Sequence, residues 1–172
     1  MQGERNIMSR KSPSKRIRNA GGGSANEAIP SSRKTGYTIQ ETGKADGVLP
    51  DTCIWIEFFR NGRSEGAETI DRLLRTDSVY TCGPVLYELL QGIRSAGEKS
   101  AVLDNMSGVE YVEVARDTWV IAAALSQELR ASGTTIPLSD IIIAALCLQH
   151  GLAIYTEDSH FNSIHDLKHY KD

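Results

Sequence analysis

The most constraining feature of the chain is a segment of helical length, "TIPLSDIIIAALCLQHG" from Thr135 to Gly151, that has no polar face. Its one acidic residue, Asp140, stands directly before eight consecutive apolar residues, 141–148. A helix that is apolar all round is buried on every side, so other elements must surround it. The 172 residues suffice for one domain of ordinary size with a core, plus an extension.

A carboxylate at the start of this run needs an explanation, because burying an unpaired charge is expensive. One interpretation is structural. Ser139 and Asp140 follow Pro137 where a helix start is expected, and short oxygen-bearing side chains cap helix N-termini. The other interpretation is that Asp140 binds a ligand. Taken alone, the position of Asp140 favours the cap, and the other acidic residues of the chain shift the balance toward the ligand.

Short apolar runs alternate with helical patterns from Gly47 onward. Strands are predicted at 47–51, 78–82, 109–114 and 152–156, with a last edge strand near Ile164. Helices are predicted at 52–60, 83–94, 98–106 and 117–133, in addition to the buried one. This alternation implies right-handed crossovers, and therefore an α/β fold in which a mainly parallel sheet is sandwiched between helices.

Residues 1–46 differ from the rest in composition and charge. They hold nine Lys or Arg against four Asp or Glu, a net charge of +5, whereas residues 47–172 hold 10 basic and 18 acidic residues, a net charge of -8. Rich in Gly and Ser and without apolar periodicity, the first segment is predicted to be a disordered basic tail. Either the natural chain begins near Gly47 or Val48, or the tail is an added arm with weak attraction for nucleic acid.

Several classes of protein are disfavoured by what the sequence lacks. No apolar h-region follows the basic start and no run reaches the length of a membrane span, so we expect a soluble cytoplasmic protein without membrane contact. The cysteines Cys53, Cys82 and Cys147 are odd in number and form no CxxC pair, which argues against a disulfide framework and against a zinc site.

Acidic residues stand at the ends of the predicted elements. Asp51 and Asp158 each follow a strand, and Asp140 begins a helix. Because ligands gather beyond the carboxyl ends of parallel strands, the three acids are expected to converge on one rim of the sheet. Glu88 is not selected in this way: with Leu86 at the centre of its helical stripe, Glu88 lies roughly 160 to 200° away, on the solvated face.

Carboxylates that meet at one point repel one another, by about 4 kcal/mol per pair at about 4 Å and an effective dielectric near 20. Such a cluster must take up protons or a cation. Ligands that are all oxygen favour Mg²⁺, with Mn²⁺ as a substitute, over zinc. The corresponding chemistry is hydrolysis of a phosphodiester bond by metal-activated water.

Four stretches, "LPDTCIWIEFF", "YELLQG", "IPLSDIIIAA" and "YTEDSHF", resemble the successive signatures of the PIN-domain family, and specifically its VapC-type toxins of bacterial toxin-antitoxin pairs. The resemblance covers residues 47–172 and implies a three-layer α/β/α sandwich with a central parallel sheet. It also implies a Mg²⁺-dependent endoribonuclease that cuts structured RNA and is silenced by a cognate antitoxin. The aliphatic helices suggest a homodimer.

The same resemblance assigns roles to individual residues. Asp51 and Asp140 would be the principal metal ligands, Glu88 a supporting acid and Asp158 the fourth carboxylate. Three hydroxyl residues would hydrogen-bond to these acids; they are Thr52, Ser139 and Thr156. The rival functions are a catalytically silent PIN-like module that binds RNA or protein, and a Mg²⁺-dependent hydrolase of small phosphoesters. Against the second, Cys53 occupies the place where such phosphatases usually carry another Asp.

Other residues invite functional interpretations that we disfavour. His165 and His169 are expected at the surface, and His160 is expected to pack with Phe161 beneath the loop that bears Asp158. Two tryptophans, Trp55 and Trp119, are expected in core or dimer packing rather than stacked on RNA bases. Arginines near the first helices either bind phosphates or are merely solvated; these are Arg60, Arg63, Arg72 and Arg75.

Overall fold

The computed structural model describes residues 47–60, 65–76 and 79–171. The predicted basic tail, residues 1–46, and Arg63 lie outside the described residues.

Within the described residues, four short strands run parallel to one another: β1 Val48–Pro50, β2 Tyr80–Cys82, β3 Glu110–Val112 and β4 Ala153–Tyr155. Strand β1 pairs with β4 and β2 pairs with β3, and a bridge between Val48 and Val79 joins the two pairs. The order across the strands is therefore β3-β2-β1-β4. The predicted edge strand near Ile164 is wrong, because residues Ser159–Ser163 form a 3-10 helix, η1, and His169 then forms an isolated bridge with Ile154 of β4.

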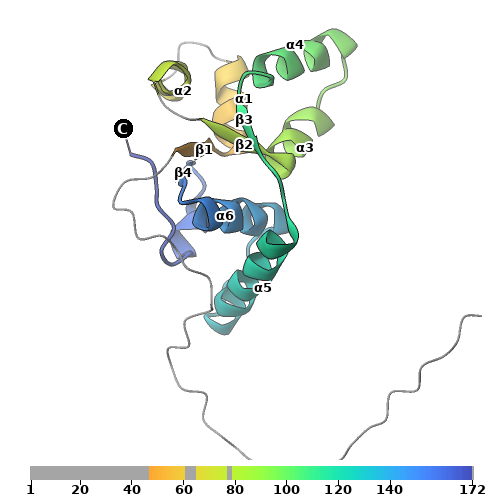
Figure 1. Cartoon of the computed structure of the whole chain (residues 1–172). Coiled ribbons are helices and arrows are strands. Elements are labelled where there is room, and N and C mark those ends of the chain that lie inside the picture. Colours follow the sequence, from red (N-terminus) through yellow and green to blue (C-terminus); the bar gives the residue numbers. More distant parts are fainter. Residues whose placement is uncertain (1–46, 61–64, 77–78, 172) are drawn as a thin grey trace, which may run out of the picture. The chain divides into compact units, whose positions relative to one another are not determined.

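In the part of the chain that the structure describes, six α-helices connect the strands: α1 Thr52–Arg60, α2 Glu65–Thr76, α3 Gly83–Gln91, α4 Ala96–Met106, α5 Arg116–Ala131 and α6 Leu138–His150. Figure 1 shows α1, α2 and α4 on one side of the strands and α5 and α6 on the other. The predicted α/β fold with parallel strands between helices is confirmed. Helix α2 was not among the predicted helices, and the other five were.

Helix α6 is the buried centre that its sequence predicts. All residues from Ile141 to Cys147 are buried, and Ile143 and Leu146 have no exposed surface. The helix ends at Gly151, whose left-handed backbone (φ 67°) suits glycine and lets its N–H bond to the Cys147 carbonyl. Helix α5 packs along α6, and β4 follows α6 directly. The position of α6 therefore sets the positions of Asp140 in its first turn and of strand β4.

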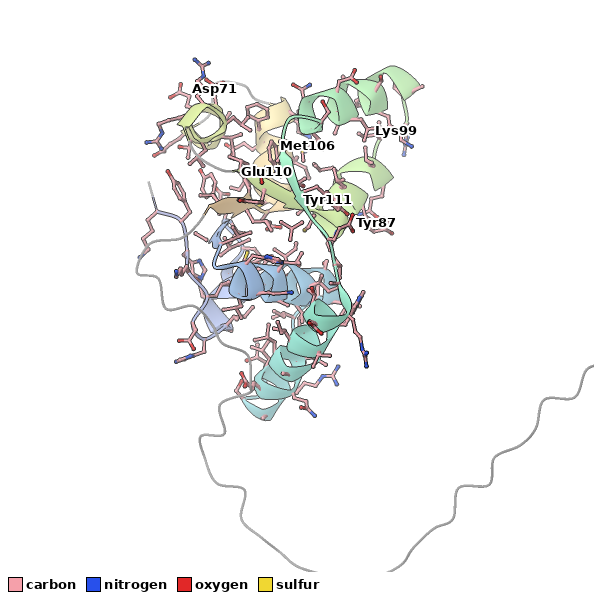
Figure 2. All side chains as sticks on the ribbon, viewed as in Figure 1. Asp71, Tyr87, Lys99, Met106, Glu110 and Tyr111 are labelled. Carbon is pink, nitrogen blue, oxygen red and sulfur yellow. The ribbon has the colours of Figure 1, made fainter. Side chains whose placement is uncertain are left out.

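The two tryptophans differ in their exposure to solvent. Trp55 is buried as expected, but Trp119 on α5 is 49% exposed, so it does not belong to the core. On α4, Met106 is buried against the core and Lys99 is exposed (Figure 2). None of the helices in the described ranges has the length and apolar character that crossing a membrane requires.

Candidate metal centre

Asp51 lies where β1 ends and α1 begins. Its backbone N–H donates to the Tyr155 carbonyl of β4 at 2.8 Å, which fixes the position of the residue between the two central strands. The carboxylate accepts the Thr52 N–H at 2.7 Å on Oδ1 and the Thr156 hydroxyl at 2.9 Å on Oδ2. The residue is only 7% exposed. Asp51 is therefore a buried carboxylate held in one orientation by neighbours from both sides.

Asp140 lies in the first turn of α6 and does not cap it. The N-cap residue is Pro137, and within the described residues no side chain makes a capping hydrogen bond there. Because proline has no N–H, Asp140 three residues later has no donor to accept at that position. Its Oδ1 instead accepts the Ser139 hydroxyl at 3.1 Å. The capping interpretation is wrong. The dipole of α6 still favours the negative charge of Asp140 near the N-terminus of the helix.

Glu88 on α3 faces the site, contrary to the prediction from periodicity. Its Oε2 accepts the Thr52 hydroxyl at 2.6 Å. The buried residues of α3 are Val85 and Leu89, not Leu86, which is only partly buried. Measured from Val85, Glu88 lies about 60° around the helix, at the border of the buried face. The error came from centring the apolar stripe one residue too late.

Asp158 follows β4 and begins the 3-10 helix η1. Its Oδ1 accepts the His160 N–H at 2.8 Å, and its own N–H donates to the Thr156 hydroxyl at 2.9 Å. The Thr156 hydroxyl therefore contacts both Asp51 and Asp158. The structure thus places each of the three predicted hydroxyl residues in a hydrogen bond within this group of acids.

The four carboxylates act on one another electrostatically. Burial raises the pKa of Asp140 above the ordinary value of 3.8, against the hydrogen bond from Ser139. Three neighbouring negative charges raise it further; they are Asp51, Asp158 and Glu88. Burial also raises the pKa of Asp51, although its hydrogen bonds lower it, and Glu88 adds to the rise. The acids from β1, α3, α6 and the loop after β4 therefore share one site.

His160 is the residue of this site that sequence reasoning placed wrongly. Its Nδ1 lies 3.4 Å from Asp140 Oδ2 and 3.2 Å from Asp158 Oδ1, and its side chain is 48% exposed. Phe161, by contrast, is fully buried as expected. The available signal was the "DSH" spacing, since an Asp that accepts the N–H two residues later turns the chain back on itself. His165 is at the surface, as predicted.

An open groove of about 830 Å³ is lined mainly by the C-terminal segment and reaches Thr156. Thr156, whose hydroxyl donates to Asp51, forms part of its wall. The remaining lining residues are Ala153, Asn162, Lys168, His169, Tyr170 and Lys171. Two lysines thus line a hollow that Thr156 connects to Asp51.

Comparisons with known proteins agree with this architecture. The PIN domain family model matches residues 48–167. Ribonuclease VapC11 of Mycobacterium tuberculosis is 30% identical over 121 residues, which cover 68% of this chain and 90% of that protein. Ribonuclease VapC5 of the same organism is 29% identical over 129 residues, covering 72% and 90%.

Solved structures give the same fold. The VapBC2 complex of Rickettsia felis, bound to a DNA fragment of its promoter, matches with a TM-score of 0.65 and 19% identity over 72% of this chain and 96% of that chain. The resemblance read from the four sequence stretches is confirmed. The chain belongs to the PIN-domain family, as a relative of the VapC ribonucleases.

Proposed function

We propose that the protein is a divalent-metal-dependent endoribonuclease, the toxin of a toxin-antitoxin pair, in which the four acids hold the metal. The observation that carries the proposal is the convergence of Asp51, Glu88, Asp140 and Asp158 on one site, with two of them, Asp51 and Asp140, buried. Such a group of charges is tolerable only when protons or a cation balance it.

The donor set fits a hard divalent cation. Carboxylate oxygens from Asp51, Asp140 and Asp158 would be its ligands, with Glu88 in support, and this favours Mg²⁺ with Mn²⁺ as a substitute. A cation bound there supplies activation of water and neutralisation of charge on the scissile phosphate.

The residues of the chain hold this site in place before any ligand arrives. The Thr156 hydroxyl orients Asp51, the Thr52 hydroxyl orients Glu88, and the Ser139 hydroxyl orients Asp140. Ligands whose orientation is fixed by such partners need little rearrangement on binding, and the loss of one such partner typically lowers metal affinity or activity about 10- to 100-fold.

RNA is the proposed substrate. The relatives VapC11 and VapC5 are named ribonucleases. The groove that reaches Thr156 offers the exposed Lys171 for phosphates. We propose that the RNA strand follows this groove. Thr156, which lines the groove and donates to Asp51, would then lie between the bound RNA and the acids. The arginines of α2 are less suited, since Arg75 is paired with Asp71 at 2.6 Å and Arg72 bonds to the Tyr170 hydroxyl.

The proposed protein partners are a cognate antitoxin and a second copy of the chain. The solved relatives include VapBC complexes of toxin with antitoxin, such as the one from Rickettsia felis. Exposed apolar side chains on α5 and at the start of α6 offer a surface for a partner; they are Trp119, Val120 and Leu138. Light scattering of the purified chain tests the homodimer.

The deciding experiment measures cleavage of an RNA pool by the purified full chain with Mg²⁺, with Mn²⁺ and with EDTA. Cleavage is expected only with metal and is expected to be lost in Asp51→Asn and Asp140→Asn. Asp104→Asn, which changes an exposed acid on α4, is the matched control and should keep full activity. Cleavage that survives EDTA or either site variant would contradict the proposal. RNA that is bound but left intact would indicate a silent binding module.

A further inference from the structure

We propose that the His160 imidazole is a direct ligand of the divalent cation, through Nδ1, alongside Asp140 and Asp158. The inference rests on the proposed metal site and deepens it, because it adds a nitrogen donor to a set of acids in which sequence reasoning recognised only oxygen. Neither the four acids nor the hydroxyls that hold them require a histidine at this point.

The donor atoms of His160, Asp140 and Asp158 lie close together. Nδ1 lies 3.4 Å from Asp140 Oδ2 and 3.2 Å from Asp158 Oδ1, and a set of one donor atom from each residue lies within 4.8 Å of one another. Ligands at neighbouring corners of an octahedron stand about 3 Å apart when each is about 2.1 Å from the ion. Nδ1 therefore already has nearly the separation from each of the two carboxylates that a shared cation requires.

The turn that bears Asp158 also holds His160 in place. The backbone N–H of His160 donates to Asp158 Oδ1 at 2.8 Å, so the turn that places one ligand also places the other. The next residue, Phe161, is fully buried and fixes η1 against the core, close to α6. The half-exposed side chain of His160 remains accessible to an ion entering from solvent.

A nitrogen ligand changes which metal such a site prefers. Mg²⁺ binds oxygen ligands almost exclusively, whereas imidazole binds later divalent metals increasingly well, in the order Mn²⁺, Fe²⁺, Co²⁺. A site with His160 as a ligand should therefore bind Mn²⁺ more tightly relative to Mg²⁺ than a site made of carboxylates alone. Removing the imidazole should reduce this preference.

The experiment uses the full chain with Mn²⁺ alone as the probe, and compares wild type with His160→Ala, His160→Gln and His165→Ala. His165 is the matched control, because it is an exposed histidine of the same segment that pairs with Asp166. Pulsed electron paramagnetic resonance reports ¹⁴N coupling from an imidazole bound directly to Mn²⁺. Titration of the protein with Mn²⁺, followed by the signal of free Mn²⁺, gives the Kd for Mn²⁺. Competition of Mg²⁺ against bound Mn²⁺ gives the Kd for Mg²⁺.

We expect ¹⁴N coupling in wild type and in His165→Ala, and its loss in both His160 variants. The Kd for Mn²⁺ should rise about 10-fold or more in those variants, and the Kd for Mg²⁺ less than about threefold, since Mg²⁺ prefers oxygen. Coupling that persists without His160, or that is absent from a wild-type protein with bound Mn²⁺, would overturn the assignment and leave the proposed nuclease intact. Failure of wild type to bind Mn²⁺ at all would overturn both.

Discussion

Replacing Asp140 by asparagine is expected to stabilise the metal-free protein while abolishing its activity. The carboxylate oxygens of Asp140 and Asp158 lie within 4.8 Å of each other. At that separation two unit charges repel by about 3 kcal/mol at an effective dielectric near 20. Because the Asp158 side chain is 39% exposed, screening by solvent lowers this to about 1 to 2 kcal/mol. Asparagine keeps an oxygen that can accept the Ser139 hydroxyl.

The raised pKa of Asp140 determines how the free energy of unfolding changes with pH. Above the ordinary value of 3.8 the unfolded chain loses its proton while the folded protein still holds it. The folded state then binds more protons, so the free energy of unfolding falls as pH rises until Asp140 is ionised in both states. At neutral pH the wild-type protein has lost this part of its free energy of unfolding, and the asparagine variant has not. The difference in free energy of unfolding between variant and wild type should therefore shrink as pH falls toward 4.

Thermal unfolding in EDTA at pH 8 measures the effect. For a domain of this size, 1 to 2 kcal/mol corresponds to a rise in Tm of about 3 to 8 °C for Asp140→Asn. Asp104→Asn should change the free energy of unfolding by less than about 0.5 kcal/mol. Mn²⁺ at about 100 times its Kd should stabilise the wild type by about 2.7 kcal/mol and the variant much less, which reverses their order. A variant less stable than wild type in EDTA would refute the account of repulsion.

Three further changes test other parts of the structure. Lys171→Ala should reduce the salt dependence of RNA binding by about one phosphate contact, whereas Lys99→Ala on the distant helix α4 should leave it unchanged; a filter-binding series in salt decides between them. Thr156→Val should lower the rate of RNA cleavage about 10- to 100-fold because Asp51 loses its hydroxyl partner. Thr156→Ser should keep most of the rate, and equal rates in both variants would exclude a role of the hydroxyl in cleavage. Leu146→Ala should lower the free energy of unfolding by about 2 to 5 kcal/mol, since the side chain is fully buried; a loss below 1 kcal/mol in denaturant titration would contradict its place in the core.

Much of the site was predictable because it depends on topology. Parallel strands that alternate with helices bring strand ends and helix starts to one rim, and this rule alone pointed to Asp51, Asp140 and Asp158. The unbroken apolar run of α6 likewise predicted its burial. The supporting hydroxyls were taken from the family resemblance, which also supplied Glu88.

The remainder depended on details that periodicity does not contain. A shift of one residue in the apolar stripe of α3, from Leu86 to Val85, decided whether Glu88 faced solvent or the site. Helix α2 is an exception, because its buried residues Ala67, Ile70 and Leu73 recur at helical spacing and periodicity alone would have predicted it. His160 came to the acids through a 3-10 turn, whose geometry follows from one hydrogen bond to a side chain rather than from a repeating pattern.

The most direct test of the metal site is a crystal of the full chain soaked in Mn²⁺, with data collected to give the anomalous signal of manganese. We expect a peak bonded to carboxylate oxygens of Asp51, Asp140 and Asp158. A saturating soak that leaves this position without a peak, while the acids keep their places, would contradict it.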